Sequence, residues 1–224
     1  MEQQVKVKEL YAPGHSRAWE YLAACEYPWE ILDRIGEIVQ TIGASLPTEQ
    51  YEYVSEGVWI ARSAKVAPTA YIGAPTVIGE NAEVRHGAYI RGGALVGDGC
   101  VVGNSVELKN CILFDGVQVP HYNYVGDSVL GHRAHLGAGS ITSNVKSDRS
   151  DVVIKTADAV ISTGRYKVGA FLGDGVEVGC NAVLNPGTVI GQGSSVYPLS
   201  SVRGVVSAGS IYKSGKDVEI VEKR

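Results

Sequence analysis

The chain has 224 residues, of which 45% are hydrophobic and 20% are charged, and its net charge is −4. A chain of this size buries one core, with room for a small appendage. The mildly acidic balance, without basic runs interleaved with aromatic residues, argues against a nucleic-acid partner. The 28 glycines are too many for a helical domain and follow no collagen period, which favours a turn-rich β structure.

Neither the cysteines nor the first residues indicate an extracellular or membrane protein. The cysteines have no Cys-x-x-Cys spacing, so neither a zinc ribbon nor a disulfide framework is indicated. They are Cys25, Cys100, Cys111 and Cys180. The opening residues MEQQVKVKEL hold no apolar signal-peptide core, and no stretch of 18 apolar residues follows. We expect a cytoplasmic protein with reduced thiols and no membrane partner.

Residues 1–57 predict two helices. The stretch SRAWEYLAACE (16–26) predicts a short helix with Ser16 as its N-cap. A second helix is expected to begin at Pro28 and to stop at Gly43. Its apolar residues fall at helical spacing: Ile31, Leu32, Ile35, Ile38, Val39 and Ile42. We expect this pair to form a helical cap over the open end of the fold that follows.

From Ile60 onward an apolar residue recurs at every sixth position. The unbroken series is Ile60, Val66, Ile72, Ile78, Val84, Ile90, Val96, Val102, Leu108 and Phe114. A period of six fits neither an α-helix nor a plain alternating strand. It is typical of a β-solenoid, in which each hexapeptide forms one flat side and one turn. Three sides close one coil, so residues 18 apart stack along one face.

The period of six is interrupted twice. Between residues 120 and 130 the chain runs in steps of five, and the pattern breaks again after Asn144 and returns at Leu172. The segment 145–167 reads as an excursion from the coil, with a hairpin as its expected form. Because insertions in repeat proteins gather on one face, often the binding face, function is expected at these interruptions.

Two stretches of the coil resemble a known family. Residues 89–144 contain the elements His-x-x-Tyr-x-Gly-Asp and Gly-Ala-Gly-x-Ile-Thr-x-Asn. They resemble the acetyltransferase domain of bifunctional N-acetylglucosamine-1-phosphate uridyltransferase/glucosamine-1-phosphate acetyltransferases. Residues 162–191 are similar to the C-terminal half of archaeal-type sugar-1-phosphate nucleotidylyltransferase/amino-sugar acetyltransferases. The resemblance covers residues 58–205, between the helical cap (1–57) and a C-terminal tail (206–224).

The resemblance implies an all-β, left-handed parallel β-helix that assembles as a homotrimer with active sites between subunits. It implies acetyl-CoA as co-substrate, no metal for acetyl transfer, and an amino-sugar 1-phosphate acceptor. Glucosamine 1-phosphate and galactosamine 1-phosphate are the expected acceptors, on the route to UDP-N-acetylglucosamine. The family's nucleotidyltransferase half has no counterpart here, because 57 residues cannot hold it and no glycine-rich LxxGxGTRL-like loop opens the chain. We therefore expect a stand-alone acetyltransferase chain without nucleotidyltransferase activity.

The candidate catalytic residues are His121, Glu107 and Asn144. Acetyl transfer to an amine needs a base, because an ammonium ion has no lone pair to attack the thioester, and imidazole titrates near neutral pH. A lone histidine in a turn is ordinarily structural, but His121 stands at the family's base position. The resemblance makes Glu107 the group that orients the imidazole, although it also fits a solvated coil residue. Asn144 matches the asparagine that places the amine and the acetyl carbonyl.

Four residues are candidates for acceptor binding. Arg91 and Lys109 lie 18 residues apart, so they are expected to stack on one face. Both match the family's phosphate-binding positions, although two ordinary surface cations would look the same. Tyr124 matches a tyrosine that contacts the sugar. His135 stands where better-known bacterial enzymes have a sugar-contacting asparagine.

Ala138 and Cys180 match positions where relatives contact the pantetheine arm of acetyl-CoA. Cys180 replaces the usual serine, and no base motif supports a separate role as a nucleophile. Val145 replaces the tyrosine that usually follows the asparagine, and the basic loop beyond it does not align. The loop's cations are Lys146, Arg149, Lys155, Arg165 and Lys167. These departures leave open which cations contact ligand and which sugar is the acceptor.

Three other functions are alternatives to acetyl transfer to an amino-sugar 1-phosphate. A zinc site of the γ-class carbonic anhydrase type is not expected, because His132 and His135 are three apart rather than five. An acyltransferase for another sugar or nucleotide sugar would keep the same site. A non-catalytic binding or assembly module would keep the coil and the helices. The presence of the family's base, tyrosine, asparagine and two cations argues against such a module.

Overall fold

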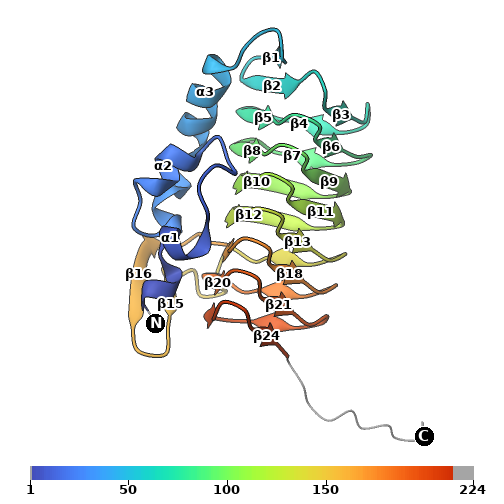
Figure 1. Ribbon diagram of the computed structural model, residues 1–224. Coiled ribbons are helices and arrows are strands. Elements are labelled where there is room, and N and C mark those ends of the chain that lie inside the picture. Colours follow the sequence, from blue (N-terminus) through green and yellow to red (C-terminus); the bar gives the residue numbers. More distant parts are fainter. Residues whose placement is uncertain (1, 214–224) are drawn as a thin grey trace, which may run out of the picture.

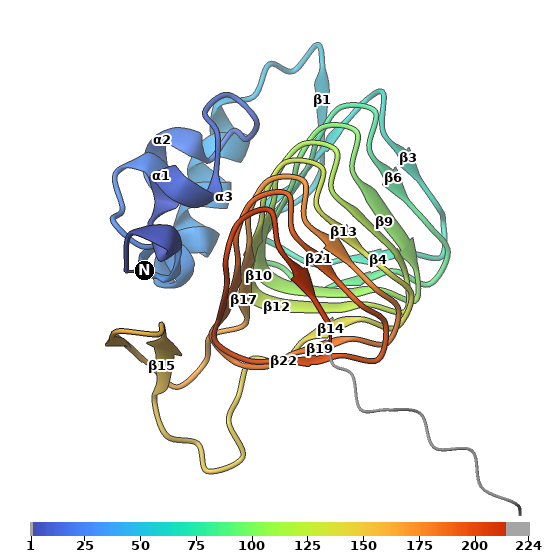
Figure 2. The same ribbon diagram turned by 60° about the horizontal axis from the view of Figure 1, so that its bottom comes forward.

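The computed structural model describes residues 2–213. Most of them form a triangular coil of short parallel strands, with a layer of helices along one side (Figures 1 and 2). Two sheets make up the coil, and β10 and β12 bend across a corner so that two of the three faces belong to one 14-stranded sheet. The strands pair with equivalent strands of the next coil, which gives the stack its parallel register.

We number the three faces in the order in which the chain visits them. Face 1 contains β2 (Val58–Ala61), β5 (Thr76–Ile78), β8 (Ala94–Val96), the second halves of β10 (Glu107–Leu113) and β12 (Tyr124–Leu130), β17 (Ala170–Leu172), β20 (Thr188–Ile190) and β23 (Val205–Val206). Face 2 contains β3 (Lys65–Val66), β6 (Glu83–Val84), β9 (Val101–Asn104), β11 (Gln118–His121), β13 (His135–Leu136), β18 (Glu177–Val178), β21 (Ser195–Val196) and β24 (Ile211–Tyr212). Face 3 contains β4 (Tyr71–Ile72), β7 (Tyr89–Ile90), the first halves of β10 and β12, β14 (Ile141–Thr142), β19 (Val183–Leu184) and β22 (Ser201–Val202).

The coil is left-handed, as expected from the resemblance. In Figure 2, with the C-terminal coils nearest the viewer, the chain passes clockwise from face 1 to face 2 to face 3 as it advances toward the viewer. The apolar series of period six points inward. Leu108, for example, is fully buried and pairs with Ile90 and Val125 of the neighbouring coils. The prediction of a left-handed β-helix of hexapeptide repeats is confirmed.

At the first interruption of the period, two successive coils have one residue fewer, because β10 and β12 run directly round the corner between faces 3 and 1. Glu107 pairs with Tyr124, one position fewer than the eighteen that separate it from its other partner, Tyr89. The turn that follows, between faces 2 and 3, keeps its usual length, and the buried side chain of Asn123 holds it. Its Oδ1 accepts the His121 N–H at 3.1 Å, and its Nδ2 donates to the carbonyl of Gly137 at 2.8 Å.

The helical segment lies along face 1 and does not cover the open end, so the capping position expected for it is wrong. It consists of η1 (Glu2–Val5), α1 (Val7–Leu10), α2 (Trp19–Ala23), η2 (Pro28–Arg34) and α3 (Ile35–Ser45). The α3 helix packs against β5, β8 and β10, and η2 packs against β12 (Figure 1). At the open end, β1 (Tyr51–Ser55) pairs antiparallel with β2 instead.

Face 1 attracts the helices because it is apolar on its outer side as well as inside. The middle residue of each of its strands points outward, and the register stacks these residues in one column. The column is Trp59, Val77, Leu95, Ile112, Val129, Phe171, Val189 and Val205. Its central six members are at most 1% exposed under the helical layer.

The helix boundaries differ from those expected. The helix predicted over 16–26 is limited to α2, although the Ser16 hydroxyl accepts the Ala18 N–H at 3.2 Å. Pro28 begins a 3-10 turn, and α3 runs through Gly43 to Ser45, so the stop predicted at Gly43 is wrong. Gly43 faces the Trp59 indole so closely that a Cβ would overlap the ring, and this contact explains the glycine.

We expect Phe171→Ala to lower the free energy of unfolding by about 3–5 kcal/mol, because it empties a buried aromatic site. Phe171 is fully buried, with its ring centroid 5.8 Å from that of Trp29 in η2. Thermal or urea denaturation of the full chain measures the loss. Val160→Ala serves as the control, because Val160 lies in the segment 145–167, outside the helical layer, with 67% of its surface exposed. Equal losses in both variants would contradict the assignment of face 1 as the covered face.

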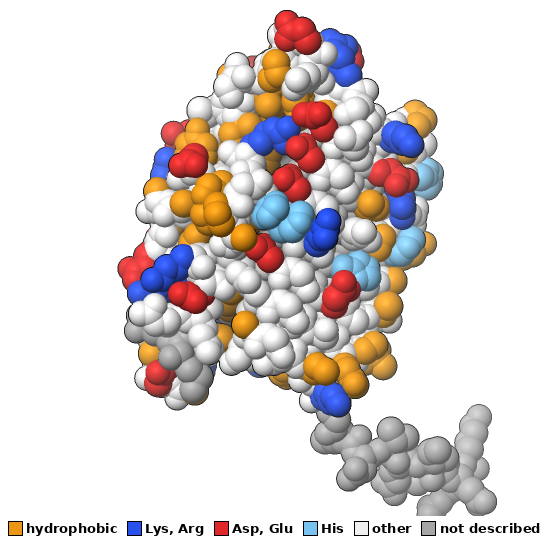
Figure 3. Space-filling model, in the orientation of Figure 1, with side chains coloured by type: hydrophobic (Ala, Val, Ile, Leu, Met, Phe, Trp, Pro, Cys, Tyr) orange, Lys and Arg blue, Asp and Glu red, His pale blue; other side chains and the backbone are white. Residues whose placement is uncertain are grey.

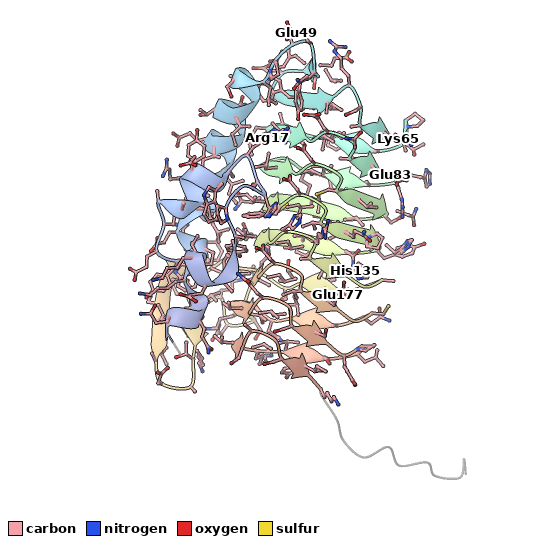
Figure 4. All side chains as sticks on the ribbon, in the orientation of Figure 1. Arg17, Glu49, Lys65, Glu83, His135 and Glu177 are labelled. Carbon is pink, nitrogen blue, oxygen red and sulfur yellow. The ribbon has the colours of Figure 1, made fainter. Side chains whose placement is uncertain are left out.

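An acidic ladder holds the helical segment to the edge between faces 1 and 2. Asp115 Oδ1 accepts the Asp98 N–H at 2.8 Å, and Asp98 Oδ1 accepts the Glu80 N–H at 2.7 Å. Arg17 from the N-terminal segment binds Asp98 at 2.6 Å and Glu80 at 3.3 Å. Figure 3 shows the row of acidic side chains along this edge, and Figure 4 labels Arg17 beside it. The ladder therefore binds neighbouring coils to each other and to the segment that packs on face 1.

The second interruption forms the expected hairpin. Strands β15 (Val152–Lys155) and β16 (Val160–Arg165) pair antiparallel beside the edge between faces 3 and 1. The buried side chains of Val152 and Ile154 attach the hairpin to the coil, and Arg165 forms an ion pair with Asp33 of η2.

The coil extends further than predicted at its C-terminal end. Strands β23 and β24 continue it to Tyr212, so the boundary expected at residue 205 is wrong. The rest of the predicted tail, residues 214–224, lies outside the described residues. Between residues 2 and 213, no helix has the length and apolarity needed to span a membrane.

Candidate active site

His121, Ala138 and Cys180 stack at the edge between faces 2 and 3. The register pairs Gln118 with His135 and His135 with Glu177, and each of the three candidates stands three positions after one of these residues. The Gly139 N–H bonds the His121 carbonyl at 3.0 Å, and the Asn181 N–H bonds the Ala138 carbonyl at 2.8 Å. The side chains of His121 and Cys180 are exposed. The predicted base and the predicted pantetheine contacts therefore form one column.

Arg91 and Lys109 stack on face 3, as the repeat predicts. They follow the paired residues Ile90 and Leu108 in neighbouring coils. Arg91 Nη1 lies 2.9 Å from Glu107 Oε1, and this hydrogen bond raises the pKa of Arg91. The structure joins Glu107 to Arg91, and no hydrogen bond links it to His121. Among residues 2–213 the His121 ring makes no hydrogen bond to another side chain.

Asp127 gathers two of the candidate groups and one further amide at the edge between faces 3 and 1. It is 4% exposed. Its carboxylate lies 3.5 Å from Lys109 Nζ, 2.8 Å from Asn110 Nδ2 and 2.5 Å from Asn144 Nδ2. Asn144 Nδ2 also lies 3.2 Å from the Tyr124 hydroxyl. A single buried carboxylate therefore positions Lys109 and Asn144 beside Tyr124.

The sequence interpretation missed Asp127 and Asn110 as part of this group. Asp127 is the last residue of the His-x-x-Tyr-x-Gly-Asp element, so the signal was present in the motif. Its positive φ of 49° and the burial of its side chain are not revealed by the motif alone. Burial raises the pKa of Tyr124, and the neighbouring carboxylate of Asp127 raises it further. Tyr124 therefore stays a neutral hydrogen-bonding group.

A cavity of about 350 Å³ opens beside Asp127, between the coil, η2 and the hairpin. Asn110 and Asp127 line it from the coil, and Arg165 and Lys167 line it from the hairpin segment. Two of the five basic-loop cations thus reach the candidate site. Arg165 is already paired with Asp33, which leaves Lys167 as the cation without an ion pair there, within the part of the chain described.

His135 lies apart from the face 3 group. It is on face 2, where its Nδ1 is 2.7 Å from Glu177 Oε2 (Figure 4). His121 stands at the edge between it and Tyr124. Within one chain the candidates therefore divide into three sets. His135 lies on face 2, and His121, Ala138 and Cys180 form the edge column. Arg91, Lys109, Tyr124 and Asn144 form the face 3 group.

Two of the four free cysteines are buried in the coil. Burial raises the pKa of Cys100 far above its ordinary value and raises that of Cys111 to about 12. Cys25 is half-buried in the helical segment, and Cys180 is exposed in the edge column. For metals, no cluster of three or more His, Cys, Asp or Glu side chains with suitable geometry occurs among residues 2–213.

Comparisons with known proteins match the coil. The family model "GMPPB C-terminal domain" matches residues 81–189. The bifunctional sugar-1-phosphate nucleotidylyltransferase/acetyltransferase of Sulfurisphaera tokodaii is 38% identical over 109 residues, which cover 49% of this chain and 27% of that protein. The bifunctional protein GlmU of Methanococcus maripaludis strain C5 is 30% identical over 120 residues, covering 54% and 29%. Among solved structures, the polySia-specific acetyltransferase NeuO has a TM-score of 0.44 at 13% identity, covering 76% of this chain and 90% of that one.

The chain therefore spans less than a third of the length of these two curated relatives. The resemblance inferred from the two sequence elements is confirmed: over about half of its length, this chain is a homologue of the bifunctional sugar-1-phosphate nucleotidylyltransferase/acetyltransferases.

Proposed function

We propose that this protein is an acyltransferase that transfers an acetyl group from acetyl-CoA to the amine of an amino-sugar 1-phosphate. Glucosamine 1-phosphate and galactosamine 1-phosphate are the proposed acceptors. The observation that carries the proposal is the edge column of His121, Ala138 and Cys180 beside the cationic and polar group of face 3. The residues proposed as the base, the donor contacts and the phosphate ligands thus lie on one edge of the coil and on the face beside it, which supports the proposal.

His121 acts as the general base in this proposal. It takes a proton from the acceptor amine as the nitrogen attacks the acetyl carbonyl, so that a C–N bond forms. The C–S bond then breaks, and the proton passes to the leaving thiolate of coenzyme A. Because the His121 ring is exposed and makes no side-chain hydrogen bond within residues 2–213, it is free to meet an amine. Such help is worth roughly 10²–10⁴ in rate.

The face 3 group binds the acceptor. Arg91 uses one N–H toward Glu107 and keeps other N–H donors for phosphate oxygens. Lys109 adds a point charge, held by Asp127. Tyr124 and Asn144 offer a hydroxyl and an amide to the sugar and to the acetyl carbonyl.

We further propose that the protein acts as a homotrimer with its sites between subunits. Face 3 has no helical cover and exposes the neighbouring, mutually tilted rings of Tyr71 and Tyr89, whose centroids are 5.4 Å apart. The separation of His135 on face 2 from Tyr124 on face 3 fits a site that collects groups from two neighbouring chains. Sedimentation of the full chain tests the assembly.

Release of free thiol from acetyl-CoA tests the proposed reaction. The purified protein is assayed with glucosamine 1-phosphate and with galactosamine 1-phosphate, and the product mass is measured. Thiol release that depends on either acceptor supports the proposal. Acetyl-CoA binding without release would favour another acceptor or a non-catalytic binding module, and a panel of nucleotide sugars separates these. We expect no nucleotidyl transfer from UTP.

Thiol labelling tests the path proposed for the donor. We expect Cys180 to be the fastest-reacting thiol toward dithiobis(nitrobenzoate), because it is exposed while Cys100 and Cys111 are buried with raised pKa values. Cys180→Ser should remove the fast phase, and acetyl-CoA should slow it severalfold in the wild type. The half-buried Cys25, in the helical segment, provides the control rate. If acetyl-CoA binds and the Cys180 rate is unchanged, the donor does not pass this edge.

A further inference from the structure

A second cavity, of about 200 Å³, lies between the hairpin and the C-terminal coils. It is lined by Lys146, Val153, Lys155, Pro186, Arg203 and Gly204. All three of its charged lining residues are cations, and they come from two segments of the chain. The cavity is separate from the one beside Asp127, with which it shares no lining residue.

The packing of the hairpin brings these cations together. The alternate residues Val152 and Ile154 are fully buried against the turn at Gly187, where an added Cβ would lie 2.8 Å from Val152. Val153 and Lys155 therefore face the other way, into the cavity. Arg203 follows β22 and lines the same cavity from the coil. The buried contact of Val152 and Ile154 with the turn at Gly187 therefore fixes the hairpin side of the cavity, and all its lining residues come from one chain.

Two of the three cations have no partner within the described part of the chain. Lys146 Nζ is held by the Ser150 hydroxyl and by the Asp151 carbonyl at 3.0 Å, with Asp148 at 4.0 Å. Among residues 2–213, neither Lys155 nor Arg203 forms a hydrogen bond or ion pair through its side chain. Two adjacent unpaired cations repel each other, so the arrangement is stabilised when an anion lies between them.

We propose that this cavity binds a phosphoryl or diphosphoryl group. The arginine guanidinium matches two phosphate oxygens in a fork, and the lysine ammonium groups supply point charges. The volume accommodates one or two phosphoryl groups but not a whole sugar nucleotide, so the remainder of the ligand would extend into solvent. The inference does not depend on the proposed acetyl transfer. The group belongs to the donor coenzyme, to a sugar phosphate, or to a separate phosphorylated ligand.

Calorimetric titration of inorganic diphosphate into the full chain at low salt tests the site. We expect binding by the wild type, and at least tenfold weaker binding by the double variant Lys155→Gln, Arg203→Gln. The matched control, Lys8→Gln with Lys65→Gln, removes the same charge from two exposed lysines on α1 and β3 and should bind as the wild type does. A thermal melt verifies that each variant is folded.

Parallel titrations with coenzyme A and with glucosamine 1-phosphate identify the source of the group. The compound that loses affinity in the double variant and not in the control is the one whose phosphate occupies the cavity. If only diphosphate loses affinity in the double variant, the cavity binds a separate phosphorylated ligand. Absence of diphosphate binding by the wild type, or equal binding by the double variant, would overturn the proposal.

Discussion

His121→Ala is expected to lower kcat for acetyl transfer by roughly 10²–10⁴ while leaving the fold intact. The side chain is exposed at the end of β11, and its removal opens no cavity. The amine then has no positioned group to take its proton. Thiol release under saturating acetyl-CoA and acceptor measures kcat, and a thermal melt within a degree or two of the wild type verifies the fold.

His86 offers a matched control for this variant. It stands at the same edge between faces 2 and 3, it is exposed, and its Nδ1 is 2.6 Å from the Thr69 hydroxyl. We expect His86→Ala to keep the wild-type kcat. The pH profile adds a second readout, because the acidic limb that reports protonation of the base should disappear with His121. Full activity of His121→Ala would contradict the assignment of His121 as the general base.

Asp127→Asn is expected to destabilise the chain by about 1–3 kcal/mol and to raise KM for the acceptor at least tenfold. The nearly buried carboxylate accepts hydrogen bonds from Lys109, Asn110 and Asn144. The NH₂ group of an asparagine side chain would face these N–H donors and could not accept from them. Asparagine tolerates the positive φ at this position, so the backbone is kept. Lys109 loses the charge that positions it.

Two measurements separate positioning from stability in this variant. Denaturation gives the stability loss, and KM for acceptor and for acetyl-CoA are determined separately below the melting range. A purely structural role would lower the melting temperature without changing the acceptor KM. The exposed residue Asp148 provides the control, since Asp148→Asn removes the same charge from a carboxylate whose partners are Lys146 and Ser150. An unchanged acceptor KM in Asp127→Asn would contradict the positioning role.

The inner structure of the coil was predictable because the apolar residues that recur at every sixth position are the residues buried inside it. Every sixth residue is apolar, and each of these positions is fixed by two coil neighbours. The outer column of face 1 also recurs coil by coil in the sequence, from Val77 through Leu95 to Val189. Read as a second apolar series, it predicts a covered face, and hence helices along the flank in place of a cap at the end.

The candidate site was predictable where it follows the coil period and not where turns decide it. The alignment of His121 with Ala138 and Cys180 follows from the repeat. The separation of Glu107 from His121 depends on the turn between faces 2 and 3 that Asn123 holds. The convergence on Asp127 depends on a single positive φ. Such local angles leave little trace in residue spacing.

The helical layer also limits how the coil can be used as a separate unit. A shortened chain without residues 2–46 would expose to water the apolar column that now lies under the helices, from Val77 to Val189. That stripe runs the length of six coils and matches its own copy in another molecule, so it would promote side-by-side association. An engineered minimal scaffold would therefore need polar residues at these outward positions, whereas the inward residues need no change.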